Sequence, residues 1–142
     1  MKVLIINGPN LNLLEKRDKN NYGSLSLASI SQAIRDEFPE IDFTFVQSNS
    51  ENELIDHIQS ADTFDGVIIN PGGYSHSSIG LRDALEILKI PKIEVHLSNL
   101  SAREEFRNNL ITASRVSGYI SGFQEISYFA AVYSLTKMIS KR

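Results

Sequence analysis

The sequence predicts an α/β domain in which helices cover both faces of a five-stranded, doubly wound parallel sheet. Short apolar runs alternate with segments of helical periodicity along the whole chain, which is the pattern of repeated β–α units. Almost every apolar run also passes directly into polar or glycine-rich residues, as strands do where an open parallel sheet places its ligands. The 142 residues are about the length of one domain, and we expect that domain to span residues 1–142.

Five short apolar runs are the predicted strands. They lie at residues 2–6, 42–46, 66–69, 92–95 and 119–121. The third run is the most informative, because the small-residue loop that follows it contains Asn70, His76 and two serines. Since the carboxyl ends of parallel strands meet at one edge of a sheet, the polar segments after these runs predict a ligand site at that edge.

The segments between the predicted strands have apolar residues at helical spacing. We expect helices at residues 27–38, 54–61, 78–88, 101–107 and 126–138. Pro39 ends the first of these helices. Two pairs of residues have the spacing of a capping box, Ser50 with Glu53 before the second helix and Ser101 with Glu104 at the start of the fourth.

The number of predicted strands and helices limits the possible architectures. Five strands and about five helices fit a flavodoxin-like domain better than an eight-stranded barrel, which needs far more residues. Residues 7–26 form the longest irregular segment, and a loop of this size in a compact domain is usually functional or mobile. This segment contains Arg17 and Tyr22.

Composition argues against several classes of function. The net charge is −3 and no long block of like charge occurs, so neither a nucleic-acid-binding arm nor a membrane-binding helix is indicated. The chain has no cysteine, which excludes disulfides, thiolate metal sites and a cysteine nucleophile. The N-terminal run MKVLIIN is too short for a signal peptide or a membrane span, and we expect a cytoplasmic protein.

Two of the three histidines follow predicted strands. His76 and His96 lie just beyond strand ends, whereas His57 lies within a helix, where a solvated surface position is expected. Glu94 precedes His96 by two residues on the same strand, so both side chains point to one face of the sheet. A carboxylate there can orient and charge an imidazole that acts as a general acid.

Other catalytic chemistries find little support. The chain has no nucleophile elbow, P-loop or dinucleotide fingerprint, and no lysine directly after a predicted strand. Two alternatives stay open: a non-catalytic module that binds a small anion or nucleotide at residues 70–73, and a metal-assisted hydrolase that uses His76 and His96. The first does not explain why Arg, Tyr and two His side chains converge on this edge, and the second lacks a clear third ligand.

Four long motifs and the pair Tyr22-Gly23 occur in order along the chain. The motifs are NGPNLNLLEKR, QSNSENELID, INPGGYSHSSIGLRDAL and IEVHLSNLSAREEFR. Together they closely resemble the type II 3-dehydroquinate dehydratases of the shikimate pathway. The resemblance implies a flavodoxin-like fold and the anti elimination of water from 3-dehydroquinate, through an enolate, to give 3-dehydroshikimate. It also implies that neither a metal ion nor an organic cofactor takes part.

The resemblance implies a role for each of several residues in the reaction. Tyr22 matches the family's base, and Arg17 matches the essential arginine whose positive charge would favour the phenolate. His96 matches the general acid, with Glu94 as its partner. Asn12 matches the region that holds a water molecule against the enolate oxygen.

Further residues match the family's contacts to substrate and to a second subunit. Asn70 and the backbone amides of Leu97 and Ser98 match contacts to the substrate's carboxylate and hydroxyl groups. His76 and Arg107 match contacts to the ring hydroxyls. The resemblance further implies that Asp83 completes the site of an adjacent subunit in a trimer, and that four trimers form a homododecamer.

Overall fold

The computed structural model describes residues 1–142 and contains a five-stranded parallel sheet with the strand order β2-β1-β3-β4-β5. The strands are β1 (Lys2–Asn7), β2 (Asp42–Gln47), β3 (Gly66–Asn70), β4 (Lys92–His96) and β5 (Gly118–Ser121). Each predicted strand is present and extends by one residue beyond its predicted range. This strand order is that of flavodoxin-like folds, so the predicted fold class is confirmed.

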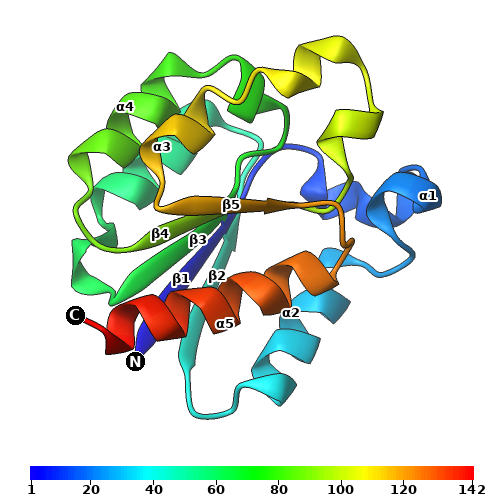
Figure 1. The fold of residues 1–142 in the computed structure, drawn as a ribbon. Coiled ribbons are helices and arrows are strands. Elements are labelled where there is room, and N and C mark those ends of the chain that lie inside the picture. Colours follow the sequence, from blue (N-terminus) through cyan, green and yellow to red (C-terminus); the bar gives the residue numbers. More distant parts are fainter.

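Helices cover both faces of the sheet, as Figure 1 shows. Helices α2 (Leu27–Glu37) and α5 (Ile126–Ser140) pack on one face, and α3 (Glu51–Gln59) and α4 (Ile79–Ile87) pack on the other. None of the helices has the length and apolar character needed to cross a membrane.

Alternating strand residues divide the core into two layers. Val3 and Ile5 of β1 face α2 and α5, whereas Leu4 and Ile6 face α3 and α4. This alternation follows from the two-residue period of a β-strand. All four side chains are buried, and complete burial of such an aliphatic side chain is worth about 1.5–3 kcal/mol.

The predicted helix at residues 101–107 is wrong. Two short 3₁₀ helices, η4 (Leu100–Ala102) and η5 (Glu105–Asn108), occupy this region. Asn99, and not Ser101, caps the first of them by accepting a hydrogen bond from the Ser101 N–H. Glu104 does not complete a capping box because its carboxylate accepts a hydrogen bond from Arg107 Nε at 2.6 Å.

The long segment after β1 is more regular than the sequence indicates. It contains the 3₁₀ helix η1 (Leu11–Lys16) and the one-turn helix α1 (Lys19–Tyr22), for which Asp18 is the N-cap. Ser50 does cap α3 as predicted. In place of closing the capping box, however, the Glu53 carboxylate accepts a hydrogen bond from the Ser48 hydroxyl at 2.5 Å.

The loops after β1 and β3 touch at the carboxyl edge of the sheet. The Gly8 N–H donates to Asn70 O at 2.8 Å, and a Cβ atom at Gly8 would lie 2.5 Å from Pro71 O. Only glycine permits this approach of the two backbones. After β1 the chain continues to α2 on one face of the sheet, and after β3 it continues to α4 on the other face. These loops therefore form the switch point at which such folds bind ligands.

Candidate active site

A cavity lies at the carboxyl edge of β3 and β4, beneath the loop that follows β1. Most of the site residues expected from the sequence line it. The lining residues are Leu11, Arg17, Tyr22, Asn70, Gly72, Gly73, His76, His96, Leu97, Ser98, Leu100, Arg103 and Arg107.

Two guanidinium groups meet at the Tyr22 hydroxyl. Tyr22 is buried, and its oxygen accepts hydrogen bonds from Arg17 Nη2 and, at 2.6 Å, from Arg103 Nη1. The Arg17 guanidinium carbon also lies 3.8 Å from the centroid of the phenol ring. Burial lowers the pKa of Arg17 from its ordinary value, yet arginine keeps its charge in proteins. The Tyr22 oxygen therefore faces two positively charged hydrogen-bond donors.

Arg103 is the main site residue that the sequence interpretation missed. It comes from the segment after β4 and also donates from Nη1 to Ser98 Oγ at 3.0 Å. Its Nε is buried without a hydrogen-bond partner. The signal was a second arginine four residues before Arg107 in the motif SAREEFR. Spacing along the chain could not show that its side chain reaches Tyr22, which is 81 positions away.

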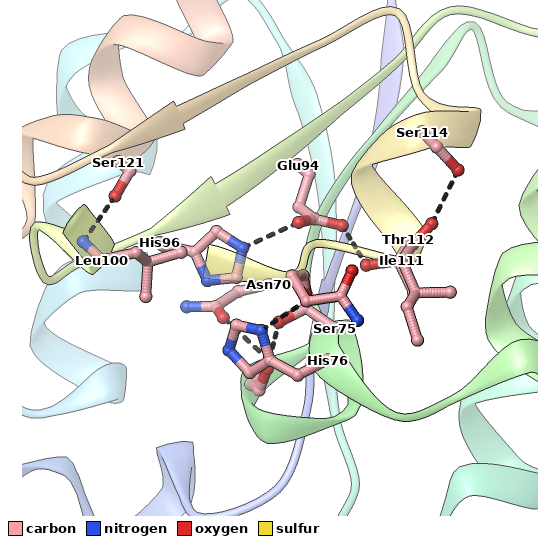
Figure 2. Close-up of polar contacts among 12 residues, drawn as sticks. Asn70, Ser75, His76, Glu94, His96, Leu100, Ile111, Thr112, Ser114 and Ser121 are labelled. Atoms are coloured by element: carbon pink, nitrogen blue, oxygen red, sulfur yellow. Dashed lines mark hydrogen bonds and ion pairs between the residues drawn. The ribbon is translucent and has the colours of Figure 1, made fainter. Parts of the chain in front are cut away.

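His96 and Glu94 form the expected pair at the end of β4. His96 Nε2 donates to Glu94 Oε2 at 2.7 Å, and both side chains are buried. The other carboxylate oxygen accepts a hydrogen bond from the Thr112 hydroxyl. Figure 2 shows this chain of three side chains. His96 Nδ1 is the ring nitrogen that this pairing leaves for a bound molecule.

His76 lies beside His96 in the same cavity, with 6.4 Å between the ring centroids (Figure 2). Its Nδ1 donates to the carbonyl oxygen of Asn109 at 3.0 Å. Burial lowers the pKa of His76 and outweighs the hydrogen bond to Asn109, which acts in the opposite direction. The lowered pKa favours the neutral ring, in which Nε2 can accept a hydrogen bond from a hydroxyl group.

Asn70 is fixed by a buried network at the ends of β1 and β3. Its Oδ1 accepts from the Gly72 N–H at 3.1 Å, and its Nδ2 donates to the Tyr128 hydroxyl at 3.2 Å. The Tyr128 hydroxyl in turn donates to Asn7 Oδ1 at 2.5 Å. Complete burial raises the pKa of Tyr128, so this phenol stays neutral. The remaining N–H of the Asn70 amide is available to the cavity.

Three of the expected residues do not line the cavity. Glu94 is bound to His96, which does line it, whereas Asn12 and Asp83 lie apart from the others. Asn12 is exposed on η1, and Asp83 is exposed on α4, where its carboxylate accepts from Arg82 Nη1 at 2.6 Å. Within a single chain neither side chain is brought to the other site residues. Their expected roles stay predictions.

The fold and the cavity together define the class of protein. A phenol between two guanidinium groups faces the same cavity as a histidine paired with a buried carboxylate. The first group is suited to take a proton and the second to give one. Arginine and amide side chains supply donors for a small, oxygen-rich, anionic molecule. This is an α/β enzyme with a site for acid–base chemistry.

Comparison with known proteins identifies the family. The model of the family described as Dehydroquinase class II matches residues 1–136. The 3-dehydroquinate dehydratase of Caldicellulosiruptor bescii is 48% identical over 142 residues, which cover 97% of this chain and 98% of that protein. The 3-dehydroquinate dehydratase of Thermotoga petrophila is 46% identical over 143 residues, which cover 99% of each chain. The chain belongs to the class II dehydroquinase family.

Solved structures agree with this assignment. The crystal structure of type II dehydroquinase from Butyrivibrio crossotus matches with a TM-score of 0.93 and 42% sequence identity, over 96% of this chain and 97% of that one. The type II dehydroquinase from Propionibacterium acnes matches with a TM-score of 0.89 and 34% identity, over 95% and 96% of the two chains.

Proposed function

We propose that this protein catalyses the dehydration of 3-dehydroquinate to 3-dehydroshikimate by anti elimination through an enolate. The observation that carries the proposal is that a candidate base and a candidate acid line the same cavity. The Tyr22 hydroxyl lies between Arg17 and Arg103, and His96 is bound to Glu94. Full-length similarity to proteins named 3-dehydroquinate dehydratase supports the same reaction.

The reaction starts at Tyr22. As the base, its phenolate oxygen, which is held by the two guanidinium groups, removes a proton from the carbon next to the ketone, and the C–H electrons form the enolate. A water molecule held by Asn12 stabilises the enolate oxygen. The enolate then collapses to a carbon–carbon double bond conjugated with the ketone, and the C–O bond breaks. His96 protonates the departing hydroxyl, which leaves as water, while Glu94 stabilises the imidazolium form.

The polar groups around Tyr22 and His96 recognise the substrate. Asn70 and the backbone amides of Leu97 and Ser98 bind the carboxylate and a hydroxyl group. Neutral His76 accepts a hydrogen bond from one ring hydroxyl, and the planar fork of Arg107 donates to another. Neither a metal ion nor an organic cofactor has a role in this mechanism.

The enzyme acts as a homo-oligomer in the cytoplasm, in the shikimate pathway of aromatic amino-acid biosynthesis. Asp83 completes the site of an adjacent subunit in a trimer, and four trimers form a dodecamer. The surface of α4 supports this assembly. Ile79 and Ile87 are 64% and 70% exposed, and each lies four residues from Asp83 on the same face of the helix. An apolar surface of this kind around a carboxylate is suited to a protein interface.

An assay of the purified protein tests the proposed reaction. With 3-dehydroquinate, the absorbance of the conjugated enone should rise, and it should rise equally with a chelator present or after borohydride treatment with substrate. Loss of activity with the chelator would favour the metal-assisted alternative, although no three histidine or acidic side chains gather to hold a metal. Loss after borohydride would point to a Schiff base. Anion binding without turnover would favour the non-catalytic module.

A further inference from the structure

Thr112 contacts the acid–base pair without lining the cavity. It is the first residue of the 3₁₀ helix η6 (Thr112–Arg115) and is completely buried. Its hydroxyl donates to Glu94 Oε1, while His96 donates to Glu94 Oε2. Figure 2 shows Glu94 between the two donors.

Glu94 depends on these two hydrogen bonds. Its side chain is completely buried in a strand that is paired on both sides, by β3 and by β5. A buried carboxylate is stable only when its oxygens are satisfied, because water is not available to them. With one donor on each oxygen, the plane of the carboxylate is fixed, and the carboxylate in turn fixes the His96 ring.

Thr112 is itself held firmly. The preceding residue, Ile111, donates its N–H to Ser75 O at 2.8 Å, which ties η6 to the loop after β3. The branched side chain of threonine also has few allowed rotamers. The hydroxyl is therefore a rigid donor, set at a fixed point behind the general acid.

We propose that Thr112 is a positioning residue for His96 and acts through Glu94. This inference rests on the proposed function for its effect on turnover. Without the hydroxyl, Glu94 Oε1 has no donor, the ionised carboxylate is less stable, and the imidazole loses both its fixed orientation and part of its counter-charge. The sequence motifs gave no sign of this role, since Thr112 lies 18 residues beyond Glu94.

The replacement Thr112→Val tests this role because it keeps the shape of the side chain and removes the hydroxyl. We expect kcat for 3-dehydroquinate to fall about tenfold to a hundredfold, the scale on which misplacing a catalytic group acts. KM should change little, because Thr112 does not touch the cavity. Thr112→Ser keeps the donor and should restore most of the activity. Ser50→Ala removes a helix cap on α3 and should leave kcat unchanged.

A double variant shows whether Thr112 acts through His96. In a His96→Ala background, Thr112→Val should cause no further loss, because the group that it positions is gone. A loss of equal size in both backgrounds would overturn the proposal. So would parent-like turnover of Thr112→Val, or a serine variant as poor as the valine variant. If Thr112→Val does not fold, Thr112→Ala replaces it in the same comparison with Thr112→Ser.

Nuclear magnetic resonance separates this proposal from the proposed function. The ring nitrogen signals of His96 should shift in Thr112→Val, whereas those of His57 on α3 should not. If the parent protein does not turn over 3-dehydroquinate, the proposed function fails, and the His96 signals still test the contact. Unchanged His96 signals in Thr112→Val would overturn the positioning role.

Discussion

Two buried tyrosines have opposite surroundings. Tyr22 lies between the charged groups of Arg17 and Arg103, whereas Tyr128 lies between the neutral amides of Asn7 and Asn70. Two positive charges face the oxygen of Tyr22, whereas burial raises the pKa of Tyr128 and keeps its phenol protonated. The same side chain therefore serves as a candidate base in one place and as a structural donor in the other.

The sequence could predict only part of this arrangement. Tyr22 and Arg17 are five residues apart, so the contact between them depends only on the conformation of one segment. The contact of Tyr128 with Asn7 joins residues 121 positions apart, and that of Arg103 with Tyr22 joins residues 81 apart. Such contacts depend on how the strands and loops are placed in space. Periodicity and motif spacing carry no information about them.

The first prediction at the residue scale concerns the base. Tyr22→Phe should lower kcat at least about a hundredfold, the usual effect of removing an acid or base. Arg103→Met and Arg17→Met should each lower kcat as well, because each removes one of the two charged donors that hold the Tyr22 oxygen. Steady-state kinetics with 3-dehydroquinate measures all three. His57→Ala is the matched control and should behave like the parent, whereas near-normal turnover of Tyr22→Phe would show that another group is the base.

Among the secondary-structure elements, the sequence correctly predicted the helices that pack on the sheet. The apolar periodicity of α2, α3, α4 and α5 exists because each buries one face, so their patterns could be read from the sequence. The short helices α1, η4 and η5 each contain at most one buried residue, and the side chains of Asp18 and Asn99 cap the first two of them. Their residues carry no periodic signal. The site uses these irregular segments, since Tyr22 and Arg107 belong to them.

Helix α5 is tied to the ends of β1 and β3 by the Tyr128 hydroxyl, and this tie should depend on pH. The pKa of Tyr128 is raised by burial, whereas a tyrosine of the unfolded chain ionises near pH 10. The stabilisation is therefore complete below about pH 10 and is lost as the pH rises above it, because only the unfolded state gains from ionisation. Urea unfolding between about pH 8 and pH 11, a range that brackets the ordinary tyrosine pKa, measures this loss of unfolding free energy.

The variant Tyr128→Phe supplies the comparison for this pH dependence. At neutral pH it should be less stable by about 1–3 kcal/mol, because it leaves buried amide groups of Asn7 and Asn70 without a partner. Above pH 10 its stability should fall less steeply than that of the parent. Parallel curves for the two proteins would show that Tyr128 ionises as readily in the folded state as in the unfolded state.

At the scale of the whole molecule, one expected residue is far from its own chain's cavity. Asp83 lies on the exposed face of α4 between Ile79 and Ile87. The sheet topology directs α4 away from the carboxyl edge of the sheet, where Tyr22 of α1 and His96 of β4 line the cavity, as Figure 1 shows for the helix. The role predicted for this carboxylate therefore requires a second subunit.

The last prediction tests this shared site by complementation. Asp83→Ala and Tyr22→Phe should each be poor enzymes, for different reasons. In a trimer refolded from an equal mixture, about one site in four should combine an intact Tyr22 with an intact Asp83 from the neighbouring chain, since a closed ring places each subunit beside one fixed neighbour. Activity of the mixture should then exceed the sum of the separate variants, and sedimentation should show a species far larger than 15.9 kDa. Hybrid oligomers that form without any gain in activity would place Asp83 in its own subunit's site or in a structural role, because combining intact residues across the interface would then not matter to turnover.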